Sequence, residues 1–471
     1  MAAIKDQIYF LNGALVELGF AASRSVTRDS PQGPATYIIS PEGRSGNYFA
    51  DLSRRSSRYQ WVADLFLPAF RARGTHQVKL GADIQRTGFD QTVGRHDYRI
   101  LRLDGSLARH VRFAGNGLLN RKNFESALYI RDHWAPREGL VLELGLRAER
   151  DQIVRGALLS PRLAAAWSPA FLKGTKVGAG FGIFSDPLNL EVLTRHQDQF
   201  SISAFQTPDG SVATGPVQVG FLTDERSLKT PRARIYSLSL ERMLPYGFHG
   251  KASYLRRAGW NGFAFLPPAG GMQQSQLWFS LQNLRRDRYD ALEFTARRTF
   301  SGQFEWAASY THSRARSNAL VDYGLENPIL GPQGGGPLGW DTPHRFLTWG
   351  WAPVPASVGP DAMRFLLREV SVAYLLEARS GFPFSVVNQE NFLVGPPNQR
   401  RLPSYFNINL HFEKKFRFLH YMWAWRFGLN NLTNHGNPNV VNNNIDSPFF
   451  LTYGRGQQRA WNVRLRFLGR R

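Results

Sequence analysis

The chain has 471 residues, no cysteine and a formal net charge of +22, from 58 Lys and Arg against 36 Asp and Glu. The absence of cysteine excludes a disulfide framework, a zinc-thiolate cluster and a thiol nucleophile. No run of about 18 apolar residues occurs, which excludes a transmembrane helix. With 44 Gly, 27 Pro and 13% aromatic residues, the chain is rich in turn residues and rings, and a soluble α/β fold is not favoured.

A charge of +22 is typical of nucleic-acid-binding proteins, but the arginines here are spread through strands and loops. They form no basic tract, and no RNP-like, helix-turn-helix or zinc-finger pattern accompanies them. We therefore expect no nucleic-acid partner. Arginines that line a wet lumen or meet lipopolysaccharide phosphates explain the charge better.

The first 20 residues have the pattern of a strand already under way and not of a signal peptide. Lys5, Asp6, Asn12 and Glu17 interrupt any apolar region that a signal peptide would need. We expect either a misplaced start or the carboxy-terminal piece of a longer product.

Strands with one apolar and one polar face recur along the rest of the chain. They cover residues 140–149, 304–311 and 405–418, and Leu144 and Arg147 exemplify the two faces. Strands with a full-length apolar face on one side and charges on the other are typical of membrane-spanning barrels. The sequence therefore predicts an all-β fold, a transmembrane antiparallel β-barrel of the outer-membrane type.

The connections between these strands alternate between short and long. The candidate tight turns lie at residues 169–174, 244–247, 300–302 and 418–420. The long linkers cover residues 185–231, 260–287, 313–343, 381–404 and 431–458. Outer-membrane barrels have short periplasmic turns and long extracellular loops, so this alternation also favours a barrel.

The last strand is expected at residues 461–467. Its apolar face consists of Trp461, Val463, Leu465 and Phe467. This strand is similar to the carboxy-terminal signal of outer-membrane proteins, which the barrel-assembly machinery reads, except that residues 468–471 follow the terminal aromatic residue.

A series of short segments resembles the barrel of TonB-dependent receptors of the Oar-like type. The first two are ALYIRDHW at residues 127–134 and LVLELGLRAE at 140–149. In order, the others are SPRL at 160–163, GFGIF at 180–184, YDAL at 289–292, ASYT at 308–311, PHRF at 343–346, SGFPF at 380–384 and GLNNLTN at 428–434. The matched strands cover residues 121–471, whereas the first 120 residues match mainly through HQVKLGAD at 76–83.

This resemblance implies a single barrel domain over residues 1–471. Barrels of the family have 22 strands, of which this chain accounts for about 16 to 19 at roughly 10 residues per strand. Full receptors also carry a signal peptide, a plug domain and a segment that contacts TonB, and none of these can be placed in residues 1–134. We expect an incomplete barrel that reaches the TonB complex only through a missing plug region.

Two groups of aromatic residues are candidates for function. Rings near strand ends favour the headgroup region of a membrane, and these are Tyr129, Trp134, Trp349, Trp351, Trp423 and Trp425. Rings in the long linkers are candidates for an extracellular ligand surface, and these are Trp260, Trp278, Trp340, Phe449 and Phe450.

The sequence contains no recognisable catalytic or cofactor site. The glycine-rich stretch at residues 178–182 lies within an alternating strand and has no helix after it, so phosphate binding is not expected. His344 and His411 fit the polar faces of strands better than a metal site. We expect no enzyme activity, no cofactor and no metal.

The resemblance implies an outer-membrane receptor that binds a ligand with its long loops and passes it through a polar lumen with energy from TonB. Outer-membrane lipid, lipopolysaccharide and the barrel-assembly machinery are the other expected partners. A passive porin-like or structural barrel, a role in adhesion or protein export, and a soluble basic binding protein remain as alternatives. The ligand itself, whether siderophore, peptide, glycan or protein, stays open.

Overall fold

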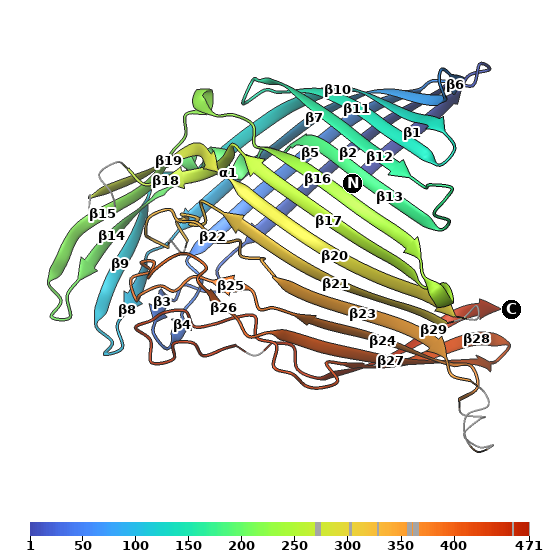
Figure 1. The fold of residues 1–471 in the computed structure, drawn as a ribbon. Helices are drawn as coiled ribbons and strands as arrows, with labels where there is room; N and C mark the ends of the chain where they lie inside the picture. The colour runs from blue at the N-terminus through green and yellow to red at the C-terminus, as the bar shows by residue number, and fades with distance from the viewer. Residues whose placement is uncertain are drawn as a thin grey trace.

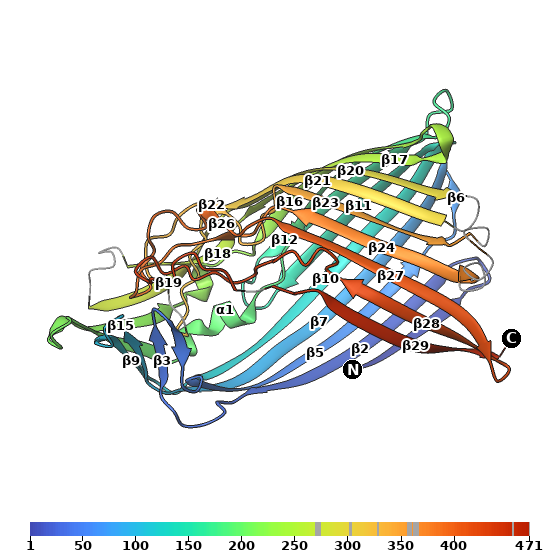
Figure 2. The same cartoon turned by 90° about the horizontal axis from the view of Figure 1, so that it is seen from below.

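The computed structural model describes residues 1–268, 275–300, 304–326, 329–355, 360, 367–454 and 456–470. Its main feature is a 19-stranded antiparallel sheet that curves into the wall of a barrel (Figures 1 and 2). Consecutive wall strands along the chain are neighbours in this sheet. The predicted all-β barrel architecture is therefore confirmed.

Seventeen of the wall strands are long, because β6 (Phe70–Arg71) and β22 (Gly336–Pro337) have only two residues each. The long strands in the described part of the chain are β1 (Ala2–Tyr9), β2 (Leu15–Asp29), β5 (Ala50–Phe66), β7 (Thr75–Arg95), β10 (Leu118–Arg137), β11 (Leu140–Asp151), β12 (Ala157–Trp167), β13 (Thr175–Ser185), β16 (Arg232–Met243), β17 (His249–Trp260), β20 (Asp287–Phe300), β21 (Phe304–Ser317), β23 (His344–Pro353), β24 (Val370–Arg379), β27 (Tyr405–Phe418), β28 (Tyr421–Asn430) and β29 (Ala460–Arg470).

Side chains along each wall strand alternate between an outer face and a lumen face. On β11, Leu144 lies opposite Leu163 of β12, and both leucines are exposed on the outer face. The neighbouring position Glu143 pairs with His133 on the lumen face. The wall thus presents exposed apolar side chains to its surroundings and charged side chains to its interior, as the sequence pattern predicts.

Connection lengths alternate along most of the chain as predicted, so the barrel has a turn end and a loop end. Residues 354–369, which join β23 to β24 at the turn end, are an exception to the pattern. At the turn end, Leu419 and His420 alone join β27 to β28, and both have positive φ (48° and 66°). Such a turn matches the twist of the paired strands. One connection at the loop end, residues 152–156, is short. The turn expected at residues 300–302 lies largely outside the described residues.

The wall is open between its first and last strands. In the described residues, β1 pairs with β2 and β29 pairs with β28, and no ladder joins β1 to β29. Because neighbouring strands alternate in direction, the first and seventeenth long strands run the same way. These two edges therefore cannot pair with each other in an antiparallel manner.

The long connections build a second sheet of eight strands beyond the loop end (Figure 1). In spatial order its strands are β18 (Gly262–Leu266), β19 (Gln276–Arg285), β15 (Val212–Leu222), β14 (Phe200–Gln206), β9 (Leu107–Ala114), β8 (Tyr98–Leu101), β3 (Tyr37–Ser40) and β4 (Gly43–Ser45). Two further short strands, β25 (Pro383–Phe384) and β26 (Arg400–Arg401), pair separately.

The helical elements of the described residues are α1 (Leu190–Thr194), η1 (Arg195–Gln197), η2 (Glu225–Ser227) and η3 (Pro245–Gly247). None of the helices in the described ranges is long and apolar enough to span a membrane. We call the eight-stranded sheet, together with α1, η1 and the described part of residues 318–335, the cap. The largest cluster of buried apolar side chains lies mainly in the cap and includes Phe221, Phe279 and Tyr323.

Candidate functional site

The lumen face of β5, β7, β10 and β11 carries a network of paired charges. Arg147 donates to Asp83 of β7 (3.3 Å) and to Glu149 on its own strand (3.2 Å). Gln60 of β5 donates to the other oxygen of Asp83 (2.9 Å) and accepts from Arg58 (3.2 Å). These side chains come from alternate positions of neighbouring strands, so strand register alone brings them together.

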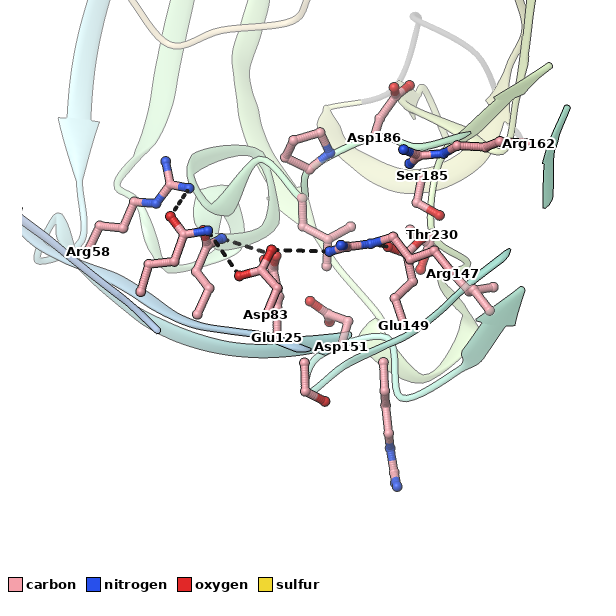
Figure 3. A pocket seen from close by; sticks show the side chains of 17 residues that line it. Arg58, Asp83, Glu125, Arg147, Glu149, Asp151, Arg162, Ser185, Asp186 and Thr230 are labelled. Atoms are coloured by element: carbon pink, nitrogen blue, oxygen red, sulfur yellow. Dashed lines mark hydrogen bonds and ion pairs between the residues drawn. The ribbon is translucent and has the colours of Figure 1, made fainter. Parts of the chain in front are cut away.

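This network borders a hollow of about 310 Å³ in the lumen wall (Figure 3). Its lining includes four arginines and five carboxylates, so neither sign of charge dominates. Several of these groups are already engaged: Asp186 binds Arg257 (2.7 Å), and Asp151 accepts from the backbone of Ile153 and Val154. The hollow can offer hydrogen bonds to a polar solute, but it has no selective charge of its own.

Tyr129 shows how the lumen wall is packed. A Cβ atom at Gly81 would lie 2.2 Å from the Tyr129 ring, so only glycine leaves room for this ring to cross β7. The Tyr129 hydroxyl thereby reaches Asp64 of β5 and donates to it (2.5 Å). Lys79 pairs with the same carboxylate (3.0 Å). Three neighbouring strands are thus tied together on the lumen face.

The segment between β13 and β16 folds back across the loop end of the lumen. Glu191 of α1 pairs with Arg54 on the lumen face of β5 (2.9 Å). Asn189 caps the N-terminus of α1 by accepting from the amides of Glu191 and Val192. Leu190 packs on buried side chains of β7 and β10. The short helix is therefore held against β5, β7 and β10, at a distance from the strands β13 and β16 that it connects. Figure 2 shows α1 at the loop end of the wall.

Arg95 joins three segments at the boundary between wall and cap. Its side chain, at the end of β7, is only 3% exposed. It donates to both oxygens of Asp198 after η1 (2.8 and 2.9 Å), and its Nε donates to Glu326 (2.9 Å). Burial opposes the charge of the guanidinium, but the two carboxylates outweigh burial and raise the pKa of Arg95.

A second arginine holds the same crossing segments together. Arg195 of η1 pairs with Asp322 (2.8 Å) and donates to the carbonyl of Tyr323 (2.7 Å). The segment after β21 is thus fixed to the segment after β13. We call the contacts of Arg95 and Arg195 with Asp198, Glu326 and Asp322 the crosspiece, which joins the cap to the loop end of the wall.

Another buried arginine in the cap, Arg109 of β9, was not predicted from the sequence. Its side chain is fully buried, donates to the Ser203 hydroxyl (2.7 Å) and the Glu390 carbonyl (3.2 Å), and lies over the Phe205 ring. Burial lowers the pKa of Arg109. Its partners are 94 and 281 residues away along the chain, a separation that strand periodicity does not encode.

The structure separates the six aromatic residues expected at the membrane interface. Trp134, Trp423 and Trp425 lie on the outer face near the turn end, so their membrane contact remains a prediction. The other three lie on the lumen face, contrary to expectation. Tyr129 binds Asp64, and Trp351 lies near Glu305, while Trp349 shares the face of Trp351. Of these three, only Trp351 lies near a strand end, whereas Tyr129 and Trp349 lie within β10 and β23. All three occupy positions that alternate with the outward-facing side chains of their strands.

The expected ligand-surface aromatics do not form one cluster. Trp260 lies at the end of β17, with Arg234 over its ring at 5.0 Å. The others contact different neighbours or stand in separate loops, with Trp278 near Phe200, Trp340 near Tyr289, Phe450 near Arg400, and Phe449 exposed. A ligand surface made of these rings remains a prediction, and it would have to extend over much of the loop end.

The proposed assembly strand forms the last edge of the wall. Trp461, Val463, Leu465 and Phe467 all lie on the outer face of β29 and are exposed. Phe467 contacts Trp423 of the neighbouring strand (5.2 Å between ring centres). The alternation predicted for this strand is confirmed, whereas recognition by the assembly machinery remains a prediction.

No group of three or more His, Asp or Glu side chains in the described ranges could hold a metal ion. His344 faces outward and accepts or donates a hydrogen bond with the Tyr310 hydroxyl (2.7 Å), and His411 lies on the lumen face of β27.

Comparison with known proteins identifies the fold. The model of the outer membrane beta barrel domain matches residues 154–401. The structure resembles the outer membrane transporter YddB of Escherichia coli (TM-score 0.66, 13% identity) over 98% of this chain and 62% of that one. It also resembles the siderophore receptor PirA of Acinetobacter baumannii (0.63, 11%) over 98% and 61%, respectively. The pyoverdine receptor FpvA of Pseudomonas aeruginosa (0.62, 10%) matches over 99% and 60%.

The chain therefore spans about three fifths of the length of these solved proteins. No curated protein sequence matches it. At 10–13% identity these structures show the fold alone. The matched proteins are a transporter and receptors of the outer membrane, not enzymes.

Proposed function

Because the chain belongs to the outer membrane beta barrel domain family, which places it in the outer membrane of a Gram-negative bacterium, we propose that it is the barrel of a TonB-dependent receptor of the Oar-like type. Its loop end faces the outside, since long loops are extracellular in such barrels. A ligand binds the cap and then passes along the polar lumen. TonB acts through a plug region, and the barrel-assembly machinery inserts the chain through β29.

The observation that carries this proposal is the crosspiece. Arg95, Asp198 and Glu326 fasten the cap to the loop end, and a paired, polar wall continues below it. A cap fastened to the loop end restricts the free passage that a passive pore requires, and it offers a surface on which a ligand can bind. The fold neighbours support the same interpretation, because one is named a siderophore receptor and another a pyoverdine receptor.

The test is passive entry of a bulky antibiotic into cells that carry the chain in the outer membrane. Arg95→Gln leaves Asp198 and Glu326 without their shared cation, which is costly for a buried pair. We expect this variant to admit the antibiotic several-fold faster than the unchanged chain. Arg131→Gln is the control, since Arg131 faces the lumen and pairs only loosely with Glu143 (3.8 Å).

Equal and rapid entry through the unchanged chain and both variants would favour the passive, porin-like alternative. Dependence on TonB is tested separately, by comparing uptake of a panel of ferric siderophores in cells with and without TonB. Siderophores are the first class to test because they are the ligands named for the similar receptors. Equal uptake in cells with and without TonB would overturn the energy-dependent part of the proposal.

A further inference from the structure

The outer face of β17, β20 and β21 changes from apolar to charged side chains toward the loop end. Leu292 and Phe294 of β20 and Tyr310 of β21 are exposed apolar side chains in the middle of the wall. Farther toward the loop end, beyond His312 on β21, the outward-facing positions carry charges. They are Arg288 and Asp290 on β20, Arg256 on β17, and Arg314 and Arg316 on β21. We call these five residues the outer arginine patch.

Strand register sets these side chains side by side. Arg256 lies opposite Asp290, which lies opposite Arg314, and one step further out Arg288 lies opposite Arg316. Neighbouring strands are about 4.8 Å apart, so these guanidinium groups share one small area of surface. Like charges directly opposite each other in a sheet destabilise it. Asp290 offsets the charge of Arg288 (2.6 Å), and an anion from outside the chain would offset that of Arg316 opposite it.

The patch has one carboxylate for four guanidinium groups. Asp290 is engaged by Arg288 (2.6 Å), by the Tyr254 hydroxyl (3.0 Å) and, more loosely, by Arg256 (3.7 Å). Among the residues that the structure describes, Arg314 and Arg316 have no carboxylate within ion-pair distance. A hollow of about 300 Å³ opens between Arg288, Asp290, Arg314 and Arg316. The patch thus combines two free guanidinium groups with space for a ligand.

We propose that the outer arginine patch binds the phosphate groups of a phosphorylated glycolipid in the outer leaflet, the chemistry of lipopolysaccharide. Guanidinium binds phosphate through two parallel hydrogen bonds, which makes arginine more suitable than lysine here. The apolar side chains directly below the patch provide a surface for acyl chains. A free phosphate or a nucleic acid would leave that apolar surface unused, so a lipid fits the whole area.

This inference rests on the outer-membrane location and on the orientation of the loop end that we propose above. It does not depend on which solute passes through the lumen. Glycolipid binding and solute uptake are separate measurements, so the failure of one is distinguishable from the failure of the other. Loss of transport with glycolipid still bound would reject the proposed transport alone.

The test is native mass spectrometry of the chain extracted from outer membranes in mild detergent. Arg314→Gln with Arg316→Gln should retain several-fold less glycolipid than the unchanged chain. Arg131→Gln with Arg297→Gln removes the same charge from the lumen face and should retain a normal amount. Arg314→Lys with Arg316→Lys keeps the charge but loses the two-pronged geometry, and an intermediate amount is expected.

A second measurement does not depend on the folding of any variant. The unchanged chain is stripped of lipid and offered the same glycolipid with and without its phosphate groups, and the dephosphorylated form should bind several-fold more weakly. Equal binding of both forms, or equal losses in the patch and lumen variants, would overturn the proposal. Inorganic phosphate that displaces the glycolipid at low concentration would identify a simple anion site and overturn it as well.

Discussion

The wall and the cap are stabilised by different physical effects. The wall is held by long backbone ladders, and its apolar side chains, such as Leu144 and Phe294, are exposed on the outer face. The cap instead buries its apolar side chains among themselves, as in Phe279 and Tyr323, whose ring centres are 4.1 Å apart. The wall therefore needs a lipid environment, whereas the cap is folded like a water-soluble domain.

The largest expected effect concerns the centre of the cap. Phe279 is fully buried, and truncation of such a side chain costs about 3–5 kcal/mol because it leaves a cavity. We expect Phe279→Ala to make the cap loops sensitive to protease in intact membranes. The wall should keep its normal heat-resistant mobility in gel electrophoresis.

Phe294→Ala is the matched control for this comparison. Phe294 is on the outer face of β20 and about half exposed (48%), so its loss leaves no closed cavity in the cap. Protection of the cap loops should therefore be unchanged. If Phe279→Ala unfolded the wall together with the cap, the two regions would form one cooperative unit and the comparison would fail.

The second prediction concerns the outer face of the wall. Leu144→Arg places a charge in the apolar band, which costs about 2–4 kcal/mol near the bilayer midplane. The cost should be visible as a lower denaturant midpoint for folding into lipid vesicles. Protease protection of the cap should change little in those molecules that fold. A midpoint equal to that of the unchanged chain would mean that Leu144 does not face lipid.

The third prediction concerns the lumen face of the same strand. Arg147 pairs with Asp83 and Glu149, but all three side chains are partly exposed to a wet lumen. Ion pairs in such surroundings contribute about 0–1 kcal/mol, so Arg147→Gln should shift the folding midpoint much less than Leu144→Arg. A shift as large as that of Leu144→Arg would mean that the two faces are not physically different.

The wall could be predicted from the sequence because its pattern is local. Leu144 and Arg147 are assigned to opposite faces by counting along one strand, and lipid and water enforce that alternation. The same rule, applied strictly, assigns Tyr129 to the polar face, since its outward neighbours are Leu128 and Ile130. The prediction that Tyr129 lies at the membrane interface was wrong because it considered only the amphipathic ring. On the lumen face, the ring crosses Gly81 and its hydroxyl binds Asp64.

The cap could not be predicted because its contacts are distant in sequence. Arg95 meets Asp198 and Glu326, which are 103 and 231 residues away. The long linkers were recognised as loops from their glycine, proline and asparagine content. The pairing of the loop strands depends on where the wall positions the ends of each loop. The pattern of residues within one loop does not predict that position.

The smallest expected effect lies at the tip of the hairpin of β14 and β15, where residues 208–211 are exposed. Asp209 accepts hydrogen bonds from the Ser211 amide (3.0 Å), the Ser211 hydroxyl (2.9 Å) and the Thr207 hydroxyl. The Thr207 hydroxyl and then the Ser211 amide lower the pKa of Asp209 from 3.8 to about 2. A lowered pKa in the folded state means that the contribution of this carboxylate to the stability of the turn is complete above pH 3.8 and is lost as the pH falls toward 2.

Cleavage of the tip by pepsin should therefore rise between pH 4 and pH 2, relative to a cleavage site elsewhere in the cap. Asp209→Asn removes the titrating group, and its relative cleavage should stay constant over that range. If both chains gained sensitivity equally, the acid response would come from the cap as a whole and not from this turn.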